Sequence, residues 1–185
     1  MELILASNSP RRKELLEAKG YKFRIIASDY EEKAFTDDPV LTAVQFSKGK
    51  ALSVFDSLKD KDGVAVIGSD TVVYHDGNIL GKPKDEKQAI SMLKSLSGKT
   101  HEVISGYAIV TKDAIITGYD LTKVTFNELT DQDIDIYIKS GLYRGKAGAY
   151  GIQDGYRLVK KYEGSLNNVI GLPTEKLYKA LEDIK

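Results

Sequence analysis

The chain has 185 residues, 42% hydrophobic and 29% charged, proportions typical of a globular protein rather than a disordered one. Lys plus Arg and Asp plus Glu each number 27, so the formal net charge is zero, which argues against a general nucleic-acid or acidic-membrane binder. The lack of cysteine excludes disulfides, thiolate metal sites and cysteine nucleophiles. With two histidines in the chain, any metal is expected to be a hard cation held by carboxylates.

The start of the chain and its apolar runs predict where the protein works. The apolar residues 1–6 are too few for a signal peptide and are followed by an Arg-Arg pair. No stretch approaches the ~20 apolar residues of a membrane span. We therefore expect a cytoplasmic protein, folded as one domain over residues 1–185, with neither a membrane nor nucleic acid as partner.

Strand-like and helix-like patterns alternate along the chain. The expected strands cover residues 2–6, 21–27, 64–67 with 71–74, 102–111, 114–128 and 157–162. The expected helices cover residues 10–19, 39–58, 85–96, 131–140 and 174–184. In the second helix the predicted apolar stripe consists of Leu41, Val44, Ala51, Leu52, Phe55 and Leu58. Because a hairpin signal at Asp76-Gly77 stands among strand–helix units, we predict an α/β domain with a mixed sheet.

The polar corner SNSPRR joins the first strand to the first helix. Ser9 is a good N-cap and Pro10 suits the first helical position, so a plain helix start explains both. Arg11 and Arg12 oppose the helix dipole unless an anion binds there, and the free N–H groups of a helix start bind phosphate oxygens. With the hydroxyl of Ser7, these groups predict a phosphate site. The alternative is a pair of solvated surface arginines.

Asp70 stands in the middle of a strand pattern, on the same face as Val66 and Val72. A charge at such a position costs several kcal/mol unless it is paired, bound to a cation or facing a cleft. We interpret Asp70 as a functional carboxylate. The alternative is that it caps a turn at a break in the strand at Gly68-Ser69.

Further charged candidates lie in three other segments. The loop SDYEEK carries Asp29, Glu31 and Glu32, and alone it resembles a solvated acidic loop. It gains interest because bound polyphosphate brings a divalent ion that takes carboxylate oxygens. Lys50, at the edge of its helix's apolar stripe, and Lys82, in LGKP, are possible partners. For each lysine alone, an ordinary surface charge is the simpler interpretation.

The glycine-rich stretch GKAGAYGIQDG leaves a surface with few side chains, which either turns tightly or admits a flat ligand. Tyr150 could stack on a base. The amide of Gln153 can match the N–H and C=O edge of uracil or thymine. A plain tight loop with a packed tyrosine is an equal alternative.

The chain resembles the Maf family of nucleoside triphosphate pyrophosphatases, once described as septum-formation inhibitors. Eight ordered stretches between residues 6 and 173 carry the resemblance: ASNSPRRKELL, SDYEEK, KGKA, IGSDTVV, LGKPKD, LSGKTHEV, KAGAYGIQ and NVIGLP. The resemblance implies an inosine-triphosphatase-like (Maf/Ham1) architecture, in which an elongated twisted sheet is flanked by helices and two lobes surround a cleft. It also suggests a homodimer.

The resemblance further implies hydrolysis of a nucleoside triphosphate to the monophosphate and pyrophosphate with a divalent cation, Mg²⁺ or alternatively Mn²⁺. The family's proton acceptor matches Asp70 and its loop glutamate matches Glu32, and both would hold the metal or orient water. Its substrate-specificity positions match Arg11, Thr71 and Gln153. The SPRR, GSDT and AGAYGIQ forms are similar to the branch that acts on dTTP and UTP, and modified pyrimidine nucleotides are further candidates.

The remaining expectations concern phosphate binding and rival functions. The phosphate-binding set is expected to be Ser7, Ser9, Arg12, Lys50 and Lys82. The rivals are a relative with another base preference, for 7-methyl-GTP or ITP/XTP, and a non-catalytic nucleotide-binding regulator of cell division. Two departures from the family stand out: Arg144-Gly145 precedes KAGAY where an acidic residue is common, and Leu166 replaces a commoner aromatic.

Overall fold

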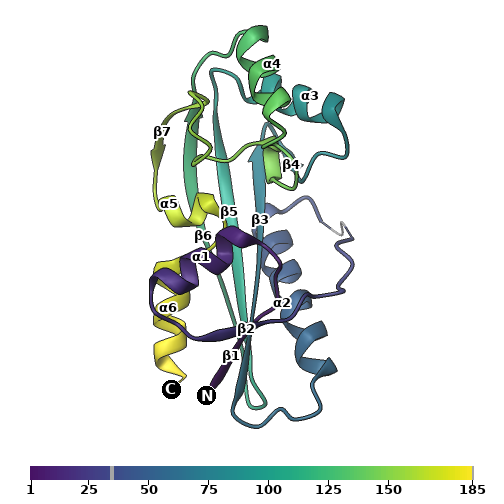
Figure 1. The fold of residues 1–185 in the computed structure, drawn as a ribbon, viewed down its shortest axis with the longest axis vertical. Helices are drawn as coiled ribbons and strands as arrows, with labels where there is room; N and C mark the ends of the chain where they lie inside the picture. The colour runs from purple at the N-terminus through teal and green to yellow at the C-terminus, as the bar shows by residue number, and fades with distance from the viewer. Residues whose placement is uncertain (34–35, 185) are drawn as a thin grey trace.

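A computed structural model describes residues 1–33 and 36–184 of the chain. Figure 1 shows an elongated molecule built on one sheet that runs along its length. The strands are β1 (Glu2–Leu5), β2 (Phe23–Ile25), β3 (Val64–His75), β4 (Asn78–Leu80), β5 (Thr100–Val110), β6 (Ile115–Phe126) and β7 (Val159–Glu163). The helices are α1 (Pro10–Ala18), α2 (Pro39–Ser57), α3 (Glu86–Leu96), α4 (Asp131–Ser140), the short 3₁₀ helix η1 (Ala147–Ala149), α5 (Leu166–Ile170) and α6 (Thr174–Asp183).

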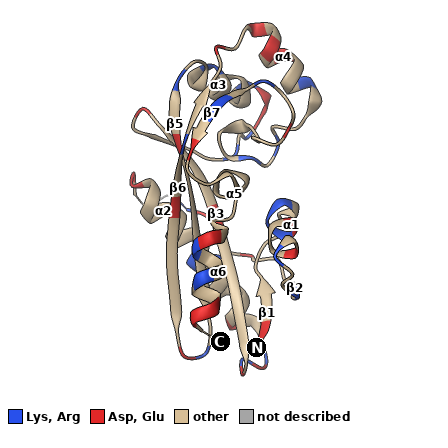
Figure 2. Cartoon of the chain, turned by 90° about the vertical axis from the view of Figure 1, so that its left-hand side faces the viewer, with Lys and Arg blue, Asp and Glu red and all other residues tan. Residues whose placement is uncertain are grey.

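The sheet is mixed, as the sequence predicted. Its strand order is β2-β1-β3-β5-β6-β7, with β4 paired to β3 beside this path. The β1 strand lies parallel to β2 and β3, whereas β3, β5, β6 and β7 form an antiparallel series. The long strands β3, β5 and β6 join the two ends of the molecule, and the edge-on view in Figure 2 shows their twist.

Each end of the sheet has its own helical cover. At one end α1 and α6 cover one face and α2 the other; at the opposite end α3, α4 and the stretch around η1 gather (Figure 1). Because successive strand residues point to opposite faces, Ile67 of β3 packs with Leu16 and Leu177 while its neighbour Val66 packs with Val54. Val73, further along the same strand, belongs to the core of the far lobe. One strand therefore links these three clusters.

The predicted break in the third strand is wrong. Residues 64–75 form one continuous strand, in which Gly68 and Ser69 keep their ladder positions opposite Ala108 and Tyr107 of β5. Asp70 consequently sits inside a regular strand opposite Gly106, and the interpretation of Asp70 as the cap of a turn is also wrong.

Gly68 and Gly106 do not form a turn; they allow α2 to approach the sheet closely. A Cβ atom on Gly106 would lie 2.5 Å from the carbonyl oxygen of Ala43, and one on Gly68 would overlap the carbonyl oxygen of Ser47. Because no side chain separates helix from sheet at these points, α2 lies directly on β3 and β5. This contact brings Lys50 of α2 over Asp70.

The face that α2 buries differs partly from the predicted stripe. Leu41 is 49% exposed, whereas Ala51 and Phe55 are buried as expected. The buried face consists of Thr42, Ala43, Phe46, Ser47, Lys50, Ala51, Val54 and Phe55. Small residues rather than large ones form its centre because the backbone of the sheet comes so close.

Two other differences concern short elements. The second strand covers only Phe23–Ile25 instead of residues 21–27, and α5 was not expected. The α5 helix has five residues, too few for a periodic pattern, and is capped by Ser165, whose side chain accepts a hydrogen bond from the Asn168 N–H. Among the described helices, none is long and apolar enough to cross a membrane.

The contact between α2 and the sheet predicts the effect of Gly106→Ala. The added methyl would press on the Ala43 carbonyl, and overpacking of this kind lowers the free energy of unfolding by about 1–3 kcal/mol. Urea denaturation would measure the loss. Gly81→Ala is the control, since a methyl there meets nothing within 4 Å. Equal denaturation midpoints for the two variants would contradict the close-contact argument.

Candidate active site

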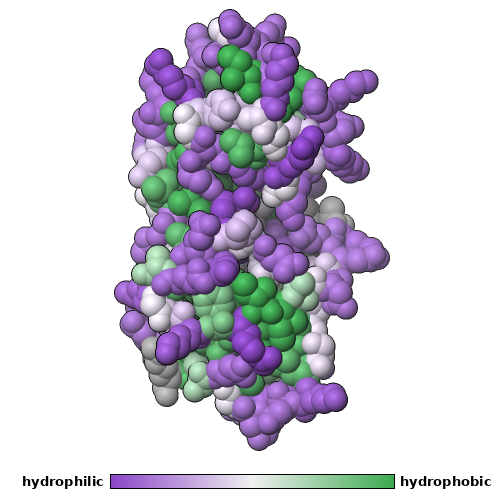
Figure 3. All heavy atoms as spheres, in the orientation of Figure 1, coloured by the Kyte–Doolittle hydropathy of each residue, from purple (hydrophilic) through white to green (hydrophobic). Residues whose placement is uncertain are grey.

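A cleft of about 560 Å³ lies where the two lobes meet. Its walls come from the corner after β1, from the loop 144–153 and from the end of α5, and residues of β3 and β5 form its floor. Figure 3 shows hydrophilic side chains around this level of the molecule. All ten residues predicted for the site line the cleft: Ser7, Ser9, Arg11, Arg12, Glu32, Lys50, Asp70, Thr71, Lys82 and Gln153.

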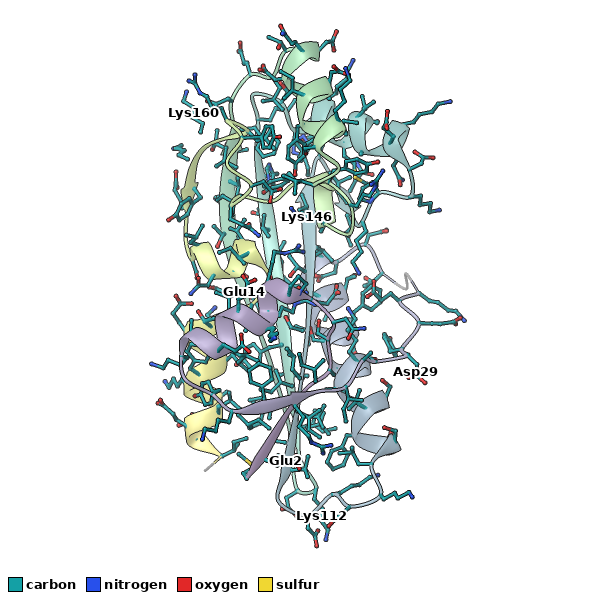
Figure 4. All side chains as sticks on the ribbon, viewed as in Figure 1. Glu2, Glu14, Asp29, Lys112, Lys146 and Lys160 are labelled. Atoms are coloured by element: carbon teal, nitrogen blue, oxygen red, sulfur yellow. The ribbon has the colours of Figure 1, made fainter. Side chains whose placement is uncertain are left out.

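Of the three acidic residues in SDYEEK, only Glu32 faces the cleft. Asp29 is exposed and projects away from the molecule (Figure 4). Glu31 is exposed and pairs with Lys33. The direction in which each side chain points depends on how the loop lies against α2, which the sequence pattern does not reveal.

Lys50 is buried between two carboxylates. Its Nζ atom lies 2.6 Å from Oδ1 of Asp70 and 2.6 Å from Oε1 of Glu32. The side chain of Lys50 is 10% exposed and that of Asp70 is 6% exposed. The surface-charge interpretation of Lys50 is therefore wrong. Lys82, by contrast, is largely exposed, with its Nζ 3.8 Å from the same Glu32 oxygen.

This cluster of charges changes the acidity of Glu32. Burial raises the pKa of its carboxyl, but the hydrogen bond from Lys50 and the charges of Lys50, Lys82 and Arg12 lower it by more. The resulting pKa lies below the ordinary 4.5, so the carboxylate is ionised at neutral pH.

The corner before α1 keeps hydrogen-bonding groups on the cleft side. Ser9 occupies the N-cap position as predicted, but within the described structure its side chain makes no capping hydrogen bond. Instead, the backbone N–H of Ser9 donates to Oγ of Ser7 at 3.2 Å. The first N–H groups of α1 are thus left for another acceptor.

The two arginines are held by the backbone at the end of α5. Nε of Arg11 donates to the carbonyl of Ile170 at 3.3 Å, and Nε of Arg12 donates to that of Gly171 at 2.8 Å. Arg12 also donates to Oγ of Ser7 and Oγ1 of Thr71. Carbonyls at a helix end need such donors, so α5 offsets the unfavourable place of these cations at the start of α1. They are not merely solvated surface arginines.

Asn168 is a buried residue that sequence reasoning left without a role. Its side chain accepts from the Ser105 N–H at 3.1 Å and donates to the Val103 carbonyl at 3.0 Å. Ser105 in turn shares a 2.7 Å hydrogen bond with Thr71. This chain of contacts connects α5 to the cleft floor, and its only signal in the sequence was the NVIGLP stretch.

The loop 144–155 places Gln153 on the exposed side of the cleft. Tyr150 is buried, its hydroxyl 2.7 Å from Nε2 of His101 and its ring edge-on to Phe126, so the packed-tyrosine alternative describes it. Arg144, one of the departures from the family pattern, lies over the ring of Tyr143 and also lines the cleft. Leu166, the other departure, lies at the start of α5 and is 40% exposed.

The fold and the cleft define a class of protein: an α/β protein with a cleft that carries two arginines at its mouth and the buried carboxylate of Asp70 at its floor. The same fold occurs in the solved structure of the Staphylococcus aureus Ham1 protein, with a TM-score of 0.51 and 15% sequence identity over 100% of both chains. The chain belongs to the Maf family, because the family model described as Maf-like protein matches residues 2–184.

Curated relatives similar to this chain carry one name. The dTTP/UTP pyrophosphatase of Aquifex aeolicus is 43% identical over 185 residues, which cover 100% of this chain and 96% of the relative. The proteins of that name from Clostridium acetobutylicum (98% of this chain, 96% of the relative) and Pyrococcus furiosus (98% and 94%) are 46% and 45% identical.

The lowered pKa of Glu32 predicts how Glu32→Gln alters stability with pH. A carboxyl whose pKa is lower in the folded state stabilises it above the unfolded-state pKa, and this contribution disappears as pH falls through the folded-state value. The wild type should therefore exceed the variant in unfolding free energy at pH 7, and the difference should shrink below about pH 4.5. Urea denaturation from pH 3 to 7 would measure it. Glu31→Gln, at an exposed pair, is the control, and a difference that does not vary with pH would contradict the account.

Proposed function

We propose that the protein is a nucleoside triphosphate pyrophosphatase that hydrolyses dTTP and UTP to the monophosphate and pyrophosphate. The observation that carries the proposal is the buried Asp70–Lys50 pair on the floor of the cleft whose mouth holds Arg11 and Arg12. A cleft that only binds an anion has no use for a carboxylate at its centre. The name shared by the relatives supports the same conclusion.

The triphosphate would bind at the corner before α1. The free N–H groups of this helix, the hydroxyls of Ser7 and Ser9 and the guanidinium of Arg12 supply donors suited to phosphate oxygens. Lys82 adds an exposed cation at the same side. An ammonium has three donors, and two of those on Lys50 face carboxylates, so one is left for a phosphate oxygen.

The chemistry would begin at Asp70. Its carboxylate takes a proton from a water molecule, whose oxygen forms a bond to the α-phosphorus while the bond from this phosphorus to the bridging oxygen breaks. Pyrophosphate leaves with the bonding electrons. Lys50 and Lys82 offset the negative charge that builds on it.

Recognition of the base would come from the other side of the cleft. The amide of Gln153 presents a donor and an acceptor, which match the acceptor and donor of a uracil or thymine edge. Thr71 bonds to Arg12, so it would act by orienting this guanidinium. Arg11, which donates to the Ile170 carbonyl, would contribute to substrate specificity next to Arg12.

A divalent cation is part of the proposal, and the residues present fit one. Lys50 contacts only Oδ1 of Asp70 and Oε1 of Glu32, so the second oxygen of each carboxylate would be the one to hold the cation. In the described part of the chain no group of three or more His, Asp or Glu residues could hold a metal. Mg²⁺ suits such a site because it binds one or two carboxylates and completes its shell with phosphate oxygens and water. It would neutralise phosphate charge.

The experiment that tests the function is pyrophosphate release from a nucleotide panel: dTTP, UTP, modified pyrimidine triphosphates, CTP, GTP, 7-methyl-GTP, ITP and XTP. Release confined to the uracil and thymine types is the expected result. Release from 7-methyl-GTP, ITP or XTP alone would assign another base preference. Binding without release would favour the regulator of cell division. The family resemblance extends the proposal to a cytoplasmic homodimer, for which sedimentation should give twice the chain mass of 20.4 kDa.

Asp70→Asn should remove the base while keeping the shape of the side chain. We expect turnover to fall by about 10²–10⁴-fold, the usual contribution of a general base, with an unchanged circular dichroism spectrum. Asp60→Asn, in the turn before β3, is the matched control and should retain full turnover. Near-normal turnover in Asp70→Asn would take Asp70 out of the mechanism.

Gln153→Ala should relax base preference more than it slows the phosphate chemistry. Loss of two hydrogen bonds of about 0.5–1.5 kcal/mol each corresponds to a fall of about 5- to 150-fold in the UTP-to-CTP ratio of kcat/KM. An unchanged ratio would place the base contact elsewhere.

Removal of divalent cations should stop pyrophosphate release. Excess chelator is expected to reduce turnover to background, and added Mg²⁺ or Mn²⁺ should restore it. Full turnover in chelator would contradict the need for a metal, because Lys50 and the arginines would then be sufficient to neutralise the phosphate charge.

A further inference from the structure

Three polar side chains are buried together under the loop that carries Gln153. The Nζ atom of Lys146 lies 2.6 Å from both carboxylate oxygens of Asp154. The hydroxyl of Tyr137, on α4, donates to Oδ2 of Asp154 at 2.6 Å. The side chains of Lys146 and Asp154 are 10% and 7% exposed, and Tyr137 is fully buried. Figure 4 shows Lys146 inside the lobe that contains α4.

This cluster closes a turn around Gln153. The backbone N–H of Gly151 donates to the Tyr137 hydroxyl at 3.2 Å, and that of Asp154 donates to the Gly151 carbonyl at 3.2 Å. A Cβ on Gly151 would lie 2.7 Å from both carboxylate oxygens of Asp154, so the carboxylate folds back over this glycine. Ile152 and Gln153 are thus held from both ends.

The desolvation of this buried ion pair is unfavourable, which indicates that the pair has a role other than stabilising the fold. A buried ion pair is often no more stabilising than apolar residues of the same volume, because both charges lose their hydration. Burial, together with the hydrogen bond to Asp154 and its charge, raises the pKa of Tyr137, so this hydroxyl remains a donor. The donors from Lys146 and Tyr137 therefore leave Asp154 one orientation, which fixes the turn.

We propose that Asp154, held by Lys146 and Tyr137, is the positioning residue that fixes Gln153 for base recognition. Asp154 would set discrimination among nucleobases without touching the substrate. The inference rests on the proposed function. It adds to Gln153, which would recognise the base, the buried residue Asp154 that would hold Gln153 in place.

The test compares Asp154→Asn with Gln153→Ala and with the double variant, using kcat and KM for UTP and CTP. We expect Asp154→Asn to raise KM for UTP and to lower the UTP-to-CTP ratio of kcat/KM by about tenfold, with kcat for UTP within about twofold. The double variant should discriminate no worse than Gln153→Ala alone, because both changes remove the same contact. Asp135→Asn, at an exposed pair on α4, is the matched control.

The outcomes separate this inference from the proposed function. An unchanged ratio in Asp154→Asn, or losses that add in the double variant, would overturn the positioning role. If Asp154→Asn does not fold, Tyr137→Phe carries the test, since it removes one oxygen and should lower the ratio by about threefold; no change in that variant would overturn the role. A wild-type protein that cleaves no pyrimidine triphosphate would overturn the function itself.

Discussion

The ammonium of Lys50, held between the carboxylates of Asp70 and Glu32, is the contact on which the site depends. Two buried or half-buried carboxylates this close would repel each other without a cation between them. Lys50 reaches this point only because α2 lies directly on the sheet, where Gly68 and Gly106 leave no side chain in the way. The close contact between helix and strands thus places charges as well as filling the core.

The remaining walls of the cleft are built from segments far apart in the chain. The corner before α1 carries Arg11 and Arg12, and carbonyls at the end of α5 hold these two arginines. The loop after α4 provides Gln153, and a buried ion pair of Lys146 and Asp154 holds that loop. Because β3 and β5 pass beneath both groups, the long strands set the spacing between the arginine corner and Gln153.

Much of the fold could be predicted from local signals. The fourth helix covers residues 131–140 as predicted, because Thr130 and Asp133 form a capping box and Gly141 adopts the left-handed conformation at its end. The break at Gly68 and the buried face of α2 were mispredicted because both depend on the helix–sheet contact. Two further features also depend on tertiary contacts and leave no periodic pattern in the sequence. One is the course of the loop that turns Glu32, but not Asp29, toward the cleft. The other is the hydrogen bond between Tyr137 and Asp154, which lie 17 residues apart.

Hydrolysis of UTP in ¹⁸O-labelled water would test the central claim most directly, namely that water attacks the α-phosphorus in this cleft. Mass spectrometry of the products shows which phosphorus received the solvent oxygen. The account predicts one labelled oxygen in uridine monophosphate and an unlabelled pyrophosphate. Label in pyrophosphate, or release of single phosphates, would contradict it, because the attack would then lie at another phosphorus than the one assigned to Asp70.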